Sequence, residues 1–158
     1  MRRRQVLSFF TAVFIANATS PVLLAGIPSK KAVYRGGTLS RPEPSTTGTV
    51  TTTAEDNFIF RYAGGEILVP YASINSMEYG QQAGRRLGLA IVLTPAFLLS
   101  KKRRHFLTIN YVDGADRQQA AVFELGKSIV RTTLASIEAR TGIKMAYQDE
   151  EARKASQR

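Results

Sequence analysis

The chain contains no cysteine and no tryptophan, and His105 is its one histidine among 158 residues. The absence of cysteine excludes disulfides, thiol nucleophiles, iron–sulfur clusters and cysteine-linked lipids, so stability has to come from a packed core. Acidic residues are also scarce, because 12 Asp and Glu stand against 22 Lys and Arg, a formal charge of +10 at pH 7. This balance favours anionic partners such as lipid headgroups, glycans or nucleic acid, without choosing among them.

The length fits one domain, and the 44% hydrophobic and 22% charged content is typical of a globular protein.

The N-terminus has the pattern of an export signal. Three arginines at positions 2–4 precede an uncharged apolar stretch, residues 6–15, which is followed by Ala-Asn-Ala at 16–18. We expect residues 1–26 to be a signal peptide or, if they are not cleaved, a signal anchor, because residues 6–26 are long enough to span a bilayer. Either interpretation exports the chain to the periplasm or the outer face of the inner membrane, and removal of the three arginines would lower the formal charge to +7.

Short β-prone segments separated by turn residues predict a β-rich domain over residues 34–147. The expected strands cover residues 34–39, 48–53, 57–62, 66–69, 106–112 and 118–125, and the spacing of Tyr71, Ile74 and Met77 predicts a turn that leads into a further strand. Glycines at 64 and 65 predict one hairpin, and the Asp-Gly-Ala-Asp turn at 113–116 predicts a second.

One helix is expected at residues 129–141, because Val130, Leu134 and Ile137 form an apolar stripe at i, i+4 and i+7. Ser128 is the expected N-terminal cap and Gly142 the C-terminal cap. Residues 148–158 contain no apolar side chain larger than alanine, which predicts a charged flexible tail.

The most unusual segment is residues 87–100, fourteen residues without a charge between two basic clusters. A helix of this length covers about 21 Å, less than the ~30 Å hydrocarbon core, so it should not span a bilayer. Two interpretations stay open: a segment of the protein core, or shallow insertion into a membrane. For the second, the expected lipid and anion contacts are Arg85, Arg86, Leu98, Leu99, Lys101, Lys102, Arg103 and Arg104.

No catalytic or metal-binding pattern is recognisable in the sequence. His105 has no Ser or Asp near it in a nucleophile pattern, and the carboxylates lie in expected turns or the tail without calcium or zinc spacing. Gly126-Lys127-Ser128 resembles the end of a phosphate-binding loop but lacks the required earlier glycine, because Ala121 occupies that position. The basic cluster at 101–104 has no interleaved aromatics, so we expect no nucleic acid partner, no metal and no cofactor.

Several segments together resemble an uncharacterised group of exported bacterial proteins with a pleckstrin-homology-like, GRAM-like domain. They are Tyr34-x-Gly-Gly-Thr-Leu, Val69-Pro-Tyr-x-x-Ile74, Glu78-Tyr-Gly-Gln81, Ser100-Lys-Lys-Arg-Arg-His-Phe-Leu-Thr-Ile109, Val122-Phe-Glu-Leu-Gly-Lys127 and residues 134–142. The resemblance covers roughly residues 34–152 and implies a bent antiparallel barrel capped by one C-terminal helix. It assigns no binding residues, and the loop at 40–48 departs from phosphoinositide-binding relatives because it holds Arg41 as its single basic residue.

These patterns predict a non-catalytic binding or scaffold module at the membrane surface of the cell envelope, with an anionic membrane surface or an envelope protein as its partner. The alternative is a small exported enzyme, a hydrolase or transferase, whose site the sequence does not reveal. A deep pocket converging on His105 together with a carboxylate would favour that alternative.

Overall fold

The computed structural model describes residues 30–81, 92–93 and 104–157. The predicted leader lies outside the described residues, as do seven of the eight predicted membrane contacts, all except Arg104. The described strands are β1 (Ala32–Gly37), β2 (Thr46–Thr51), β3 (Asn57–Tyr62), β4 (Gly65–Pro70), β5 (Ile74–Gly80), β6 (Val92–Leu93), β7 (His105–Val112), β8 (Gln118–Leu125) and β9 (Ala146–Tyr147). The helices are η1 (Tyr71–Ser73), η2 (Lys127–Ile129), α2 (Val130–Thr141) and α3 (Glu150–Ser156).

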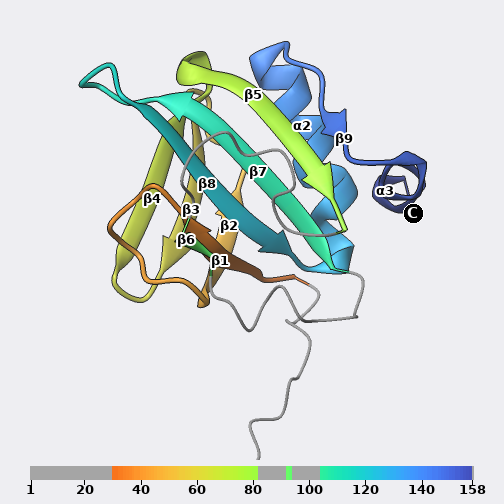
Figure 1. Ribbon diagram of the computed structural model, residues 1–158, viewed down its shortest axis with the longest axis horizontal. Helices are drawn as coiled ribbons and strands as arrows, with labels where there is room; N and C mark the ends of the chain where they lie inside the picture. The colour runs from red at the N-terminus through yellow and green to blue at the C-terminus, as the bar shows by residue number, and fades with distance from the viewer. Residues whose placement is uncertain (1–29, 82–91, 94–103, 158) are drawn as a thin grey trace, which may run out of the picture.

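The described strands form one mixed sheet in the order β4-β3-β2-β1-β8-β7-β5-β9, and β6 pairs with β1 beside this path. Every pairing is antiparallel except that of β5 with β9. Both predicted hairpins are confirmed, β3 with β4 and β7 with β8, in continuous register. In Figure 1, β5, β7 and β8 run side by side with α2 next to them, and β2, β3 and β4 form the other part of the sheet.

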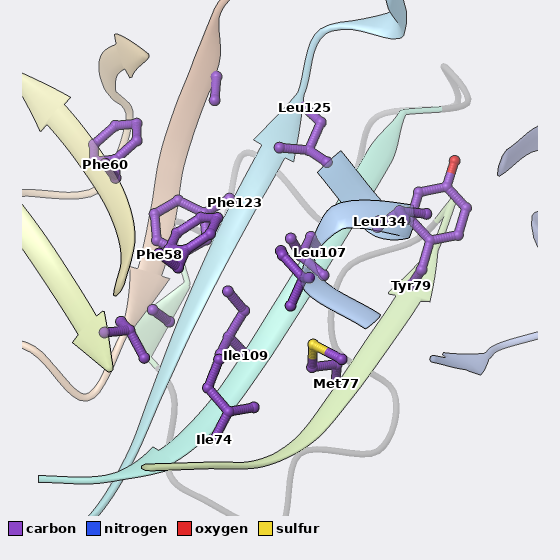
Figure 2. Close-up of a cluster of buried hydrophobic side chains, with 14 of the residues drawn as sticks. Phe58, Phe60, Ile74, Met77, Tyr79, Leu107, Ile109, Phe123, Leu125 and Leu134 are labelled. Carbon is purple, nitrogen blue, oxygen red and sulfur yellow. The ribbon is translucent and has the colours of Figure 1, made fainter. Parts of the chain in front are cut away.

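The sheet bends so that its two parts share one core. Phe123 on β8 lies 5.2 Å, between ring centroids, from both Phe58 and Phe60 on β3. In a flat sheet β3 and β8 would be separated by about 14 Å, since two strands lie between them. The aromatic contacts therefore require the sheet to fold over on itself, and Figure 2 shows these rings in one cluster with Leu107, Ile109 and Leu134.

Helix α2 closes one side of this core. Val130, Leu134 and Ile137 are buried in the same cluster, which confirms the predicted stripe. Gly142 ends the helix with φ +70°, and its N–H donates to the Glu138 carbonyl, as predicted from its capping position. The N-terminal prediction was wrong, because η2 precedes α2, and Ile129 rather than Ser128 occupies the cap position.

The flexible tail predicted for residues 148–158 was also wrong. The chain adds β9 to the edge of β5 and then forms α3, whose N-cap Asp149 accepts a hydrogen bond from the Ala152 N–H at 2.6 Å. Ala152 is fully buried in the core cluster. A small side chain permits close approach of this helix to the domain, so the absence of large apolar residues did not prevent docking.

The fold is thus β-rich, with a C-terminal helix and a short second helix, and it includes one parallel pair that the sequence did not predict. On β8 the alternation of side chains does not separate a buried face from a solvated one. Phe123 and Leu125 lie in the core cluster, while Ala120, Val122 and Glu124 on the second face are also buried. A buried second face explains how a carboxylate in this strand comes to lie away from solvent.

Candidate functional site at the basic end of the sheet

Three strands meet at one end of the sheet. In the register of β1, β8 and β7, Leu125 lies opposite both Ala32 and His105. The Gly126 N–H also donates to the Lys31 carbonyl at 2.8 Å, which joins the start of β1 to the end of β8. Four cations consequently gather here, and we call them the basic end: Lys30, Lys31, Arg104 and Lys127.

The side chains of Lys30, Lys31 and Lys127 are on exposed residues, whereas Arg104 is largely buried. Because β1 begins at this end, the polypeptide that precedes residue 30 also joins the domain here. The entry point of the chain and the exposed cations therefore lie at the same end of the sheet.

Beside the basic end lies a buried ion triad, Arg35–Glu124–Arg104. Arg35 reaches the Glu124 carboxylate at 2.6 Å from Nη2 and 2.7 Å from Nε, and Arg104 reaches it at 3.0 Å from Nη1. The side chains of Arg35, Glu124 and Arg104 are 12%, 5% and 14% exposed. Two guanidinium groups around one carboxylate leave the triad with one unit of positive charge.

Burial lowers the pKa of Arg35, and the neighbouring Glu124 carboxylate opposes this by stabilising the charged form. Arg35 also donates from Nη1 to Ser45 Oγ at 3.1 Å. The pair with Glu124 is charge-assisted and joins β1 to the middle of the sheet. The triad is therefore a structural link among three segments that are distant in sequence.

His105 stands next to the triad, and its environment keeps it neutral. Its pKa is lowered first by burial and second by the positive charge of Lys127, with Glu124 acting in the opposite direction. Burial raises the pKa of the Tyr79 phenol, whose oxygen contacts His105 Nδ1. Since the phenol keeps its proton, it donates to Nδ1, and the neutral imidazole carries its own proton on Nε2.

This arrangement uses His105 as a hydrogen-bond acceptor in packing, with its ring stacked on Tyr79 at a centroid distance of 6.1 Å. The nearby carboxylate of Glu124 is held by two arginines, which leaves it poorly suited to orient an imidazole as a base. His105 does not line the cleft beside Leu134 and Glu138, nor the cleft beside Gly37 and Glu43.

Of the predicted membrane contacts, the described part of the chain includes Arg104 alone. Its guanidinium group faces Glu124 within the buried triad, so it is less available to a headgroup than the sequence suggested. Sequence reasoning did not select Arg35 or Glu124. The available signal was a glutamate inside the otherwise apolar segment 120–125, since a carboxylate is seldom buried unless it is paired.

Within residues 30–81, 92–93 and 104–157, no cluster of three or more His, Asp or Glu side chains is arranged to hold a metal ion. In the same ranges, no helix combines the length and the apolar character needed to cross a bilayer. A cleft of about 430 Å³ lies between α2, β9 and α3, lined in part by Leu134, Glu138 and Tyr147. No known protein-family model matches the sequence, and no curated protein matches it.

Proposed function

We propose that this protein is a non-catalytic binding or scaffold module held at the membrane surface of the cell envelope, with its basic end toward the lipid. The proposal includes export through residues 1–26 and a pleckstrin-homology-like form for the barrel. The bend that brings Phe123 against Phe58, and the docking of α2 after the last long strand, support that form. The additions β9 and α3 extend it at the C-terminus.

One observation carries the proposal: the exposed cations lie where the chain enters the domain. Lys31 and Lys127 are joined through the Gly126–Lys31 hydrogen bond, and β1 starts at Ala32. An N-terminal anchor would hold this end close to the headgroups, within the ~10 Å over which charges interact at 0.1 M salt. Each cation near an anionic surface adds about 1 kcal/mol of attraction, so a few suffice to fix the orientation of an already tethered domain.

The orientation is testable because the chain has no cysteine of its own. Lys127→Cys and Ala115→Cys each introduce a single thiol, at opposite ends of the β7–β8 hairpin and about 25 Å apart by strand geometry. The full chain is labelled with a fluorophore and reconstituted in anionic vesicles that contain a headgroup quencher. We expect strong quenching for Lys127→Cys and weak quenching for Ala115→Cys.

The two labels control for each other, because both positions are exposed and both variants keep the same anchor. Equal quenching at the two sites, or stronger quenching at the Ala115 site, would contradict the orientation. Neutral vesicles should reduce the difference, since the attraction depends on the lipid charge.

The same readout tests the apolar run. We propose that Leu98 and Leu99 enter the lipid while the cations around them, Arg85, Arg86, Lys101, Lys102 and Arg103, meet the headgroups. Replacing both leucines with serine should then reduce quenching at the Lys127→Cys label and leave the thermal transition nearly unchanged. A loss of stability of several kcal/mol without a change in quenching would identify the run as core instead.

Export has a separate test. Residues 1–30 fused to a reporter that is active only after export should give an active reporter. Activity confined to a cytoplasmic reporter would reject the location in the envelope and leave the binding module without its proposed membrane.

A further inference from the structure

The cleft of about 430 Å³ runs along helix α2, and β9 and α3 form its opposite wall. In Figure 1 these three elements lie side by side in the blue, C-terminal part of the ribbon. Volumes of a few hundred Å³ are typical of sites for small molecules. The proposed contact with the membrane does not use this cleft. Its lining includes Arg131, Leu134, Ala135 and Glu138 of α2, with Tyr147 of β9 and Gln157 beyond α3.

The α2 side of the cleft has a charged residue at each end and apolar residues between them. Arg131 and Glu138 are seven positions apart, which is close to two helical turns, so they share one side of α2. Their separation along the helix axis is about 10.5 Å. Leu134 and Ala135 lie between them, three and four positions after Arg131. The cleft is therefore a groove that holds a positive and a negative group at a fixed spacing.

Both charged groups are accessible to a ligand. Arg131 is exposed, and no ion pair or hydrogen bond of the described residues involves its side chain. Glu138 is half-buried and accepts the Met145 N–H on Oε1 at 2.8 Å. A carboxylate has about four acceptor positions on its two oxygens, so this bond leaves room for a second donor. A cation and an anion consequently remain available at the two ends of the groove.

The two charges are placed against the dipole of α2. A helix is stabilised by acidic residues in its first turn and basic residues in its last turn. Arg131 lies instead in the first turn, which contains no acidic residue, and Glu138 lies in the last turn. The dipole therefore gives no stability reason for either charge. It does favour a bound anion near Arg131 and a bound cation near Glu138.

The spacing of the two groups indicates the size of the ligand. An extended chain spans at most about 3.3–3.6 Å per residue, so three residues cover about 10–11 Å. This length matches the rise from Arg131 to Glu138. The peptide groups of such a ligand need hydrogen-bond partners, and the Tyr147 hydroxyl and the Gln157 amide supply them from the opposite wall.

We propose that this cleft binds a tripeptide with free termini, whose carboxylate pairs with Arg131 and whose ammonium group pairs with Glu138. An arginine can hold a carboxylate through two parallel N–H···O bonds, which fixes the orientation of the ligand. In the extended form, a dipeptide is too short to reach both groups, and a pentapeptide places its ends too far apart. The site therefore selects the length of the peptide and both of its free ends.

Trialanine is the probe, because its side chains add little binding of their own. The full chain is placed in nanodiscs of a neutral lipid at pH 7, and binding is followed by chemical shifts of the protein. Trialanine should bind about tenfold more tightly than acetyl-Ala-Ala-Ala, which lacks the ammonium group, or Ala-Ala-Ala-amide, which lacks the carboxylate. Loss of a hydrogen bond to a charged group commonly has an effect of this size. Equal binding of either blocked peptide would overturn the proposal.

Dialanine and penta-alanine test the length. Both keep the two free termini, so they carry the same charges as trialanine. Each should bind about tenfold more weakly than trialanine, because only one terminus can pair at a time. Equal or tighter binding of penta-alanine would mean that the spacing of Arg131 and Glu138 does not select the ligand, and this result would also overturn the proposal.

Two charge variants assign each terminus to its partner. Arg131→Gln should weaken trialanine about tenfold, leave Ala-Ala-Ala-amide unchanged and not lower the thermal transition, because no described ion pair is lost. Glu138→Gln keeps an oxygen for the Met145 N–H and should weaken trialanine while leaving acetyl-Ala-Ala-Ala unchanged. In either variant, an equal loss for the free and the blocked peptide would contradict the assigned contact.

Two further variants test the position of the peptide. Ala135 is exposed and leucine is a good helix former, so Ala135→Leu should fold normally, fill the groove and abolish trialanine binding. Unchanged binding in this variant would place the peptide elsewhere and overturn the site.

Arg158 follows the lining residue Gln157 and lies outside the described residues, so it is the competing cation for the carboxylate. Arg158→Gln should bind trialanine as the original chain does. Weakened binding in Arg158→Gln, with normal binding in Arg131→Gln, would overturn the role of Arg131.

Discussion

Asp113 and Glu124 stand near opposite ends of the β7–β8 hairpin, and each is a carboxylate paired with arginine. Asp113 accepts hydrogen bonds from Ala115, Arg117 and Gln119, which are two, four and six positions away. Glu124 instead pairs with Arg104, 20 positions away, and with Arg35, 89 positions away. The first carboxylate organises a turn, and the second connects segments from different parts of the chain.

Solvent exposure separates the two sites further. The Asp113 side chain is 20% exposed and its partner Arg117 is 72% exposed, whereas the Glu124 side chain is 5% exposed between two arginines that are nearly as buried. Exposed ion pairs contribute little because water and salt screen them, while a buried charge that loses its partner is strongly unfavourable. Removal of the carboxylate should therefore lower stability more at Glu124 than at Asp113.

The largest effect is expected for Glu124→Gln. This change keeps the shape of the side chain but leaves two guanidinium groups with like charge in a largely buried site. Unfolding by urea should show a loss of about 3–5 kcal/mol. As a control, the triple variant with Arg35→Met, Arg104→Leu and Glu124→Leu should recover most of the lost stability. An apolar replacement of a whole buried ion network is often tolerated. A single-variant loss below about 1 kcal/mol would contradict a tightly buried triad.

The removal of a buried apolar side chain provides a reference for the loss of stability expected at Glu124. Leu134→Ala removes a side chain that is 3% exposed in the core cluster and should cost about 2–5 kcal/mol. The loss should not depend on salt, because no charge is altered. A change under about 0.5 kcal/mol would mean that α2 does not dock on the sheet.

The smallest loss of stability is expected for Asp113→Asn, and this loss should depend on pH. Hydrogen bonds from the Arg117 N–H, the Gln119 and Arg117 side chains and the Ala115 N–H hold the pKa of Asp113 well below its usual range. A carboxylate whose folded pKa is depressed stabilises the fold above its unfolded value, near pH 4, and loses this contribution as the pH falls through the folded value.

The transition temperature of Asp113→Asn should therefore lie below that of the original chain at pH 7, and the two curves should approach each other toward pH 2. Asp116→Asn is the matched control in the same turn. Asp116 has φ +58°, which asparagine tolerates, so that variant should differ little at any pH. A gap for Asp113→Asn that stays constant between pH 2 and pH 7 would contradict the assigned network.

Prediction from the sequence succeeded where neighbours along the chain define the structure. The hairpins around Gly65 and Asp113, the stripe of α2 and the cap at Gly142 all depend on residues within a few positions of one another. It failed at the chain segments on either side of α2. Ser128 lies in a 3₁₀ turn and not at the cap of α2. Ala152 is buried in α3, a helix that the sequence did not predict because its segment contains no large apolar residue.

The candidate sites were less predictable than the fold. Arg104 was selected for its basic neighbours, but its partner Glu124 follows from the pairing of β7 with β8. The meeting of Lys31 with Lys127 requires β1 to lie beside β8, although 80 residues, 38–117, separate these strands in the chain. Patterns among neighbouring residues in the sequence do not predict such an order of strands.

The sequence by itself determined the β-rich character, the two hairpins and the amphipathic helix, because alternation, turn residues and capping act over the short distances that covalent bonds impose. The tertiary structure decided which strands became neighbours, and with that the burial of β8 on both faces, the partners of Glu124 and the basic end. It also placed β9 and α3 beside α2, which forms the cleft that Arg131 and Glu138 line. These outcomes depend on long-range packing, in which each contact forms only after distant segments have been brought together.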